Sequence, residues 1–209
     1  MIEIIGIVLS ALIVIFAIVF HECAHGWAAY KLGDPTAKLA GRLTLNPIKH
    51  IDLFGTLILP GVLLALRFMG LNTIVFGWAK PVPVNFLQLN NPKRDMIFVA
   101  FAGPLVNIFF ALCLSRVFNF FPSSEFRDVV EFGIFANLFL AAFNLIPIPP
   151  LDGSRILAGL LPNSLAFQYL KLERYGMLLV FILLYSGLFQ KMVLPVVVVL
   201  AKFIGVSSL

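Results

Sequence analysis

The chain has 209 residues, of which 61% are hydrophobic and only 12% are charged, and its mean hydropathy is +1.02. A soluble domain has about 45–50% apolar and about 25% charged residues, so this composition excludes an ordinary soluble protein and indicates a polytopic membrane protein. The net charge of +5 is scattered over short loops, which argues against a nucleic-acid-binding stripe, and the two cysteines lie in apolar segments, which argues against a disulfide framework. We expect one membrane-embedded domain over residues 1–209.

The first predicted element is a transmembrane helix from about Ile4 to Tyr30. The run contains one glycine and no proline before His21, and it exceeds the roughly 20 apolar residues that cross a bilayer core. We interpret it as a retained helix rather than a signal peptide, because no basic residue precedes it and no small-residue cleavage site follows it.

The loop after this helix, residues 31–52, contains four Lys or Arg residues, whereas the tail before the helix contains none. Loop positives favour the cytoplasm, so the N-terminus should lie outside and this loop inside. His21 and His25 would then lie toward the cytoplasmic side, roughly 9–15 Å in from Lys31 at about 1.5 Å per residue. Within the loop, residues 37–45 alternate weakly and favour short paired strands.

An apolar run from Leu53 to Met69 is followed by a segment, residues 75–84, in which Pro81 and Pro83 exclude a helix and favour extended chain. The sequence leaves open whether this region is a full span with a return or a re-entrant hairpin. Further apolar segments cover residues 96–117 and 129–148, and residues 175–206 form two spans or one hairpin. The predicted fold class is all-α and polytopic, with about five to six transmembrane segments and short extended or re-entrant stretches near residues 37–45 and 75–86.

The segment His21-Glu22-Cys23-Ala24-His25 places three chemically active side chains at the end of the first helix. Residues i and i+4 share a helix face, so His21 and His25 can bind one metal ion, while Glu22 lies beside it and can take a proton from the attacking water. Ionisable residues inside an apolar span are functional by default. A packing cluster would not explain the spacing, and Cys23 points away from the shared face.

A catalytic zinc requires a third protein ligand and an open position. Asp152 is the strongest candidate, because it follows a proline-broken stretch where irregular backbone must face protein or a water-filled cavity, and Gly153 lets the chain turn. His50 and Asp52 are rival ligands in a polar loop. An ordinary Asp-Gly surface turn is the plain alternative for Asp152.

Three motifs in this order resemble the site-2 protease family of intramembrane zinc proteases, in its compact bacterial and archaeal form without a PDZ domain. They are His21 to Gly26, Gly103-Pro104-x-x-Asn107, and Asn144-x-x-Pro147 leading to Asp152-Gly153, and they cover residues 4 to 155. The segment from Phe76 to Pro83 also resembles part of one subgroup.

The resemblance implies one Zn²⁺ per chain, held by His21, His25 and Asp152, with Glu22 as general base. It further implies that Asn144 binds substrate or stabilises the oxyanion, and that Asn107 organises the helix core with Gly103 and Pro104. The insert at residues 53–91 departs from the minimal pattern. For His25 and Asp152 to meet, the first and fourth spans must run in the same sense, so the insert must return to its starting side.

The function expected from these features is an intramembrane zinc endopeptidase of the plasma membrane. Its partners would be a membrane-protein or peptide substrate and the lipid bilayer, with no nucleic acid. A membrane zinc transporter and a non-catalytic membrane adaptor are the alternatives, although a transporter has no need of Glu22 between the histidines. The extended segment at residues 75–84 would offer an edge to an unwound substrate, whose scissile amides a helix would hide, and charged substitutions along residues 82–86 would test this.

Overall fold

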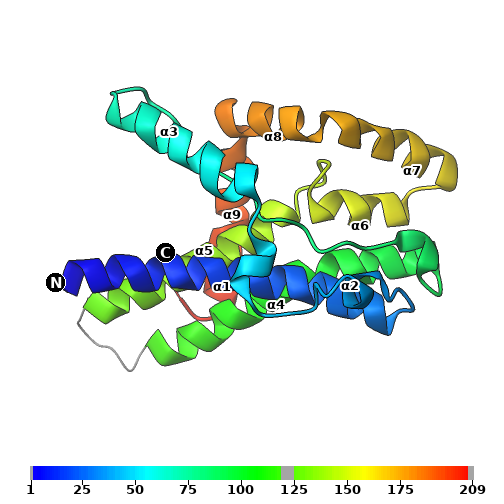
Figure 1. Ribbon diagram of the computed structural model, residues 1–209, viewed down its shortest axis with the longest axis horizontal. Coiled ribbons are helices and arrows are strands. Elements are labelled where there is room, and N and C mark those ends of the chain that lie inside the picture. Colours follow the sequence, from blue (N-terminus) through cyan, green and yellow to red (C-terminus); the bar gives the residue numbers. More distant parts are fainter. Residues whose placement is uncertain (1, 119–124, 207–209) are drawn as a thin grey trace.

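The computed structural model describes residues 2–118 and 125–206, and within these ranges the chain is helical with no strand. Three long helices form a bundle: α1 (Ile2–Lys31), α4 (Pro92–Phe118) and α5 (Glu125–Asn144). In Figure 1, α1 and α5 run in the same direction and α4 runs against them, as the meeting of His25 with Asp152 requires. The shorter elements are α2 (Thr36–Leu39), η1 (Pro47–His50), η2 (Leu53–Ile58), α3 (Leu59–Phe68), η3 (Phe86–Gln88), α6 (Asp152–Leu160), α7 (Asn163–Leu170), η4 (Lys171–Tyr175), α8 (Gly176–Tyr185) and α9 (Leu188–Phe203).

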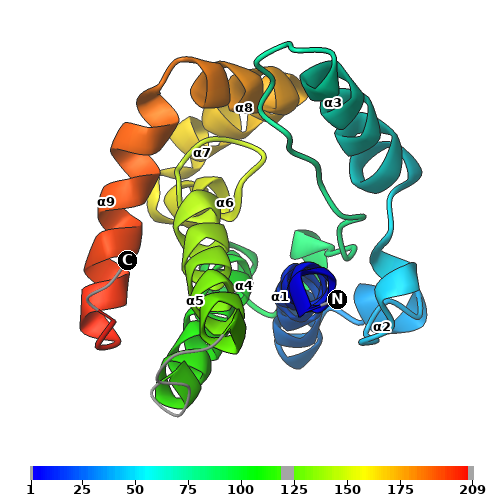
Figure 2. The same cartoon turned by 90° about the vertical axis from the view of Figure 1, so that its left-hand side faces the viewer.

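Two apolar clusters hold the elements together. The larger one lies where α4, α5, α8 and α9 meet, and Ile134, Leu138 and Val193 in it are completely buried. The smaller cluster, around Ala29 and Val99, joins the end of α1 to the start of α4 and to α6. Figure 2 shows α9, α8 and α3 arching around the bundle and the loops that follow α5. Helices α3, α8 and α9 therefore surround the bundle on the side on which α6 begins.

Within residues 2–118 and 125–206, two helices are long and apolar enough to cross a membrane, Ile4–Lys31 and Pro92–Phe118. A third candidate is the pair Asn163–Tyr185 and Leu188–Phe203, which is bent by 80° at a break where Gly187 adopts a left-handed conformation, φ 73°. In α5, Arg127, Asp128 and Glu131 lower the apolar character of the first turns. The all-helical prediction is confirmed for the described residues, whereas the predicted count of five to six spans is not confirmed.

The insert consists of a short apolar helix and a non-helical return. Residues Leu53–Phe68 form η2 and α3, too short to span a bilayer alone, and residues 71–85 come back without helix or strand. Three contacts attach the return to the start of the insert: Trp78 N donates to Gly55 O (3.1 Å), Lys80 N to His50 O (2.9 Å), and Thr56 Oγ1 to Trp78 O (2.9 Å). The extended stretch predicted near residues 75–86 agrees with this course up to residue 85, and Phe86 begins η3.

The strand prediction for residues 37–45 is wrong, because α2 occupies the start of this stretch. Asp34 accepts the amide of Thr36 (2.9 Å) at the helix start, and Gly41 ends the helix in a left-handed conformation, φ 62°. Ala37 is completely buried, so one turn of helix satisfies the backbone while placing this side chain inside. The weak alternation of apolar and polar side chains over these nine residues could not predict the burial of Ala37 by tertiary contacts.

Candidate metal centre and active site

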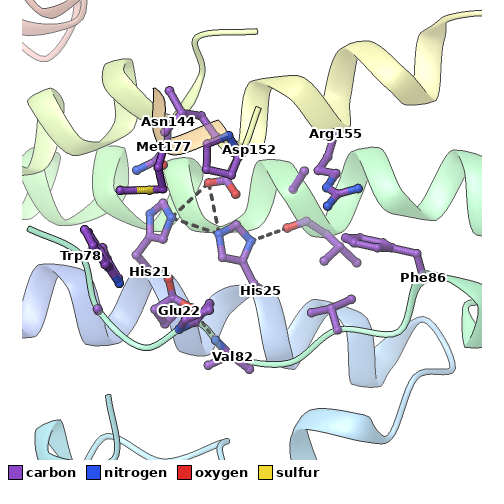
Figure 3. Close-up of a pocket in the computed structure, with 17 residues that line it drawn as sticks. His21, Glu22, His25, Trp78, Val82, Phe86, Asn144, Asp152, Arg155 and Met177 are labelled. Atoms are coloured by element: carbon purple, nitrogen blue, oxygen red, sulfur yellow. Dashed lines mark hydrogen bonds and ion pairs between the residues drawn. The ribbon is translucent and has the colours of Figure 1, made fainter. Parts of the chain in front are cut away.

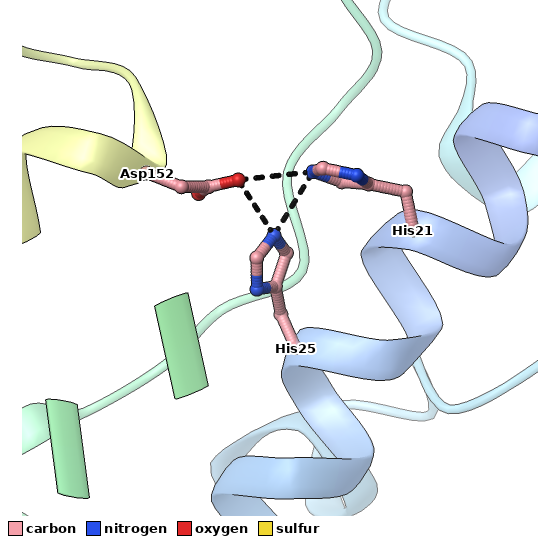
Figure 4. A group of neighbouring side chains, drawn as sticks. All are labelled: His21, His25 and Asp152. Carbon is pink, nitrogen blue, oxygen red and sulfur yellow. Dashed lines mark hydrogen bonds and ion pairs between the residues drawn. The ribbon is translucent and has the colours of Figure 1, made fainter. Parts of the chain in front are cut away.

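Three side chains from two distant parts of the chain converge on one point, as Figure 4 shows. Asp152 Oδ2 lies 3.1 Å from His21 Nε2 and 3.2 Å from His25 Nε2, and the two Nε2 atoms are 3.0 Å apart. Both histidines are more than nine-tenths buried. The sequence-predicted ligands His21, His25 and Asp152 are thus brought together, and they form a group able to hold a metal ion.

The hydrogen bonds of Nδ1 in His21 and His25 determine that Nε2 of each ring faces the metal centre. His25 Nδ1 is 2.7 Å from the carbonyl of Val99, and His21 Nδ1 is 2.6 Å from Oδ1 of Asn107. Both partners are acceptors, since Asn107 uses its Nδ2 to donate to Ala17 O (3.1 Å), so each Nδ1 carries the ring proton. Each ring therefore turns its Nε2, the nitrogen that remains for a metal ion, toward Asp152.

This donor set fits a zinc ion. Asp152 Oδ2 is buried, and the Nε2 atoms of His21 and His25 lie 3.1 and 3.2 Å from it. Zinc bonds of about 2.0–2.1 Å in a tetrahedron put neighbouring ligand atoms about 3.3 Å apart, close to the separations here. Two neutral histidines and a carboxylate are ligand types that catalytic zinc uses. A divalent cation bound between these three atoms would be coordinated by both rings and would offset the charge of the buried carboxylate.

The motif on α4 brings that helix against the histidines. A Cβ at Gly103 would lie 2.6 Å from Cε1 of His25 and 2.7 Å from Cε1 of His21, so any side chain there would push α4 away. Pro104 lies inside α4 and lacks the N–H that would bond the carbonyl of Ala100, which lines the cavity. Asn107 is completely buried and contacts His21 directly. The packing role expected for these three residues agrees with these contacts, and Asn107 also orients His21.

Asp152 is the first residue of α6 and comes directly after the turn that follows α5. A Cβ at Gly153 would lie 2.5 Å from the carbonyl oxygen of Ile146 and would collide with that of Leu145. The sequence interpretation supposed that Gly153 lets the chain turn. Its φ is not positive, so the position needs glycine because the backbone segments approach closely. This approach holds the carboxylate of Asp152 over the histidines.

A cavity of about 410 Å³ opens beside the three ligands, and Figure 3 shows the side chains around it. Glu22 lines it, and its Oε2 accepts the amide of Val82 (2.7 Å). Asn144, the last residue of α5, also lines it and donates to the carbonyl of Leu140 (3.0 Å). A second cavity of about 190 Å³ shares Glu22 and Asn144 and continues toward Ile18 and Phe143. The two cavities form one groove along the non-helical return.

The rival ligands lie outside this centre. His50 Nε2 is 2.8 Å from the carbonyl of Thr44 and 3.9 Å from Cys23 Sγ. Asp52 caps η2 by accepting the amide of Gly55 (2.6 Å). Cys23 faces Thr44 O at 3.0 Å, on the side of α1 away from the histidine pair. Of the described acidic, histidine and cysteine side chains, only His21, His25 and Asp152 converge.

Sequence reasoning missed several residues around the groove. Trp78 lines both cavities, and Met177 and Arg155 line the larger one from α8 and α6. Arg155 also forms an ion pair with Glu173 (2.5 and 2.7 Å) and lies over the Phe86 ring. Asn137, in the middle of α5, is buried against Asn107. Only Asn137 gave a signal, as an unexplained amide in an apolar span.

Comparison with known proteins agrees with this geometry. The profile of peptidase family M50 matches residues 9–125 and 121–187. YwhC of Bacillus subtilis, named as a candidate zinc metalloprotease, is 39% identical over 184 residues, which are 83% of this chain and 78% of YwhC. Rip2 of Mycolicibacterium smegmatis, named in the same way, is 29% identical over 198 residues, covering 93% of this chain and 73% of Rip2.

The zinc metalloprotease MJ0392 of Methanocaldococcus jannaschii is 33% identical over 122 residues, which are 56% of this chain and 35% of that protein. No solved structure matches the chain. The family match extends over both the histidine helix and Asp152, and the apolar helices agree with a membrane protein. The chain therefore belongs to peptidase family M50 and is a metalloprotease with the apolar helices of a membrane protein.

Proposed function

We propose that this protein is an intramembrane zinc endopeptidase of the His-Glu-x-x-His type, which hydrolyses peptide bonds in or near transmembrane segments of other proteins. One observation carries the proposal: the buried Oδ2 of Asp152 lies 3.1 and 3.2 Å from the Nε2 atoms of His21 and His25, at the edge of a groove that Glu22 also lines. This combines one metal site with one carboxylate beside it, which hydrolysis requires.

In the proposed reaction His21, His25 and Asp152 hold one Zn²⁺ per chain. Bound zinc supplies Lewis acidity, which acidifies water and polarises the scissile carbonyl. Glu22 takes the proton of the attacking water and delivers it to the leaving amine, and the Val82 amide donates to its Oε2 and so positions the carboxylate. Asn144, at the junction of the two cavities, binds the substrate backbone or the oxyanion.

The groove favours an extended substrate. Its wall along residues 78–86 has no helix until η3 begins at Phe86, and its other lining is largely apolar. A transmembrane helix hides its amides in internal hydrogen bonds, so cleavage requires local unwinding against such a wall. The substrate class is therefore a membrane protein or peptide with a segment able to unwind.

The proposed setting is the plasma membrane, with the N-terminus outside and the active site toward the cytoplasm. Lys31 at the end of α1 and three cationic residues in the loop after it support this sidedness. The bilayer and a membrane-protein substrate are the proposed partners, and the scattered charge supports no nucleic acid.

The test is Glu22→Gln, with Cys23→Ala as a neighbouring control on the opposite side of α1. A single-span peptide reconstituted with the purified protein in liposomes serves as substrate. We expect Glu22→Gln to lose about 10²–10⁴-fold in cleavage while keeping its zinc, and Cys23→Ala to cleave normally. A Glu22→Gln variant that cleaves at the wild-type rate contradicts the proposal. Zinc flux into the same liposomes without any cleavage identifies a transporter instead, and neither activity identifies an adaptor.

A further inference from the structure

A chain of side-chain hydrogen bonds runs from the metal centre through the bundle. His21 Nδ1 on α1 is 2.6 Å from Asn107 Oδ1 on α4, and Asn107 Nδ2 is 3.1 Å from Asn137 Oδ1 on α5. Asn137 Nδ2 in turn donates to the carbonyl of Gly133 (2.9 Å), one turn earlier in α5. The chain links all three helices of the bundle at the depth of the metal ligand.

Each amide in this chain has one permitted orientation. Asn137 must turn its NH₂ toward Gly133 O, because a carbonyl only accepts, and its oxygen then faces Asn107. Asn107 places its two N–H groups against two oxygens, those of Ala17 and Asn137, which leaves Oδ1 for His21. A flipped Asn107 would set three oxygens against one another in a buried site.

This orientation decides what His21 can do. With an oxygen facing it, His21 Nδ1 carries the proton and Nε2 keeps the lone pair that binds a metal. With an NH₂ facing it, the proton would move to Nε2, which would then point an N–H at Asp152 and could not bind a cation. The side-chain amide of Asn107 therefore has two possible orientations, related by a flip, and its hydrogen-bond partners select one of them.

We propose that Asn137 is a positioning residue of the metal centre, which locks the Asn107 amide and through it the metal-binding tautomer of His21. The inference rests on the proposed metal site. It adds a residue from the middle of α5, which has no printed hydrogen bond to a metal ligand and does not line the groove in the described structure.

His25 provides an internal reference, because its ring is oriented by a different kind of group. Its Nδ1 faces the backbone carbonyl of Val99, which cannot rotate as a side-chain amide does. Loss of Asn137 should therefore change His21 and leave His25 as it is. A general loosening of the bundle would affect both rings.

A purely structural role for Asn137 is the competing explanation, since its bond to Gly133 and its burial also stabilise the contact of α5 with α4. Leu138 offers a matched control, because it is the next residue on α5, is completely buried and has no part in the amide chain. Asn137→Leu removes the acceptor, Leu138→Ala damages packing alone, and Asn137→Asp keeps an acceptor for Asn107 while losing the amide donor.

The experiment measures the histidine tautomers of the metal-free protein by ¹⁵N NMR in detergent micelles, with ¹⁵N only in the three histidines. Wild type, Leu138→Ala and Asn137→Asp should show His21 protonated at Nδ1. Asn137→Leu should show a share of His21 protonated at Nε2, with the His25 signals unchanged. If Asn137→Leu does not fold, Asn137→Ala removes the same acceptor and replaces it.

Zinc affinity, measured by competition with a chelator, gives the second readout. We expect Asn137→Leu to bind zinc roughly tenfold more weakly, as loss of an outer partner does elsewhere, and the two other variants to stay within about threefold of wild type. An unchanged His21 tautomer in folded Asn137→Leu, or an equal loss of affinity in Leu138→Ala, overturns the inference. Neither readout uses proteolysis, so an inactive protein that shows these shifts refutes the proposed function and keeps the inference.

Discussion

The helical bundle and the insert solve opposite problems on the two sides of one groove. The metal ligands rest on α1 and α6, braced by α4 and α5, and both histidines are oriented by buried partners. The insert contributes a wall with no regular structure from residue 71 to 85, and α3 beside it exposes large apolar side chains such as Phe68 and Val62.

The difference separates the chemistry from the binding of the substrate. A metal site tolerates little displacement of its ligands, so it is built from helices with satisfied polar groups. A groove for an unwound chain needs unpaired backbone at its wall, which a helix does not offer. The Glu22–Val82 hydrogen bond joins the two regions beside the metal ligands.

The largest expected effect breaks the bundle side. Asp152→Ala or His21→Ala should lower zinc affinity on the order of 100-fold or more, because loss of a ligand exceeds the loss of an outer partner. Zinc content of the purified protein, measured by atomic absorption, checks this. Asp52→Ala is the control, since it removes a nearby carboxylate that only caps η2, and it should keep its zinc. Full zinc occupancy in Asp152→Ala would refute that residue as the third ligand.

A charge in the wall should break the insert side without touching the metal. Val84 lines the groove, whereas Leu87 is 86% exposed and does not, so Val84→Lys and Leu87→Lys place the same charge inside and outside. We expect Val84→Lys to reduce cleavage of the reconstituted peptide by roughly tenfold or more, because substrate binding would bury an unpaired charge. Zinc content should stay at the wild-type level in both. Equal cleavage by the two variants would remove the wall from substrate binding.

The smallest expected effect lies at the mouth of the groove, where Arg155 on α6 meets Phe86 of the insert. Glu173→Gln removes the partly exposed ion pair but leaves Arg155 over the Phe86 ring, so stability should change by only about 0.5 kcal/mol. Thermal unfolding in detergent measures this, and Arg174→Gln serves as the neighbouring control. A large loss of stability in Glu173→Gln alone would make the pair a latch between the regions.

The sequence was most informative where physical costs leave few options. Two histidines and a glutamate in an apolar helix predict a site, and the broken stretch before Asp152 predicts a polar pocket, and the structure brings these residues together. The direction of the helices followed from the need for His25 and Asp152 to meet. These inferences use periodicity, length and the cost of buried polar groups, which a sequence displays directly.

Contacts between distant segments were beyond that reach. Nothing local shows that Ala37 is buried by a turn of helix, that Gly153 backs onto the end of α5, or that Asn137 faces Asn107. The predicted number of spans is not confirmed, for a related reason. The charges at the start of α5 lower its apolar character, and an 80° bend divides the apolar run before α9, so the described helices include two clear candidate spans and one bent pair.

Pro81 and Pro83 give the wall a property of its own. Of residues 81–83 only Val82 has an N–H, and Glu22 occupies it. An extended chain lying along these three residues finds carbonyl acceptors but no free donor, so it must bring its own N–H groups to this stretch and turn its carbonyls elsewhere. The prolines thereby set the register of a bound chain relative to the zinc ligands. They also interrupt the row of N–H groups, so a second copy of the protein finds no continuous edge with which to pair.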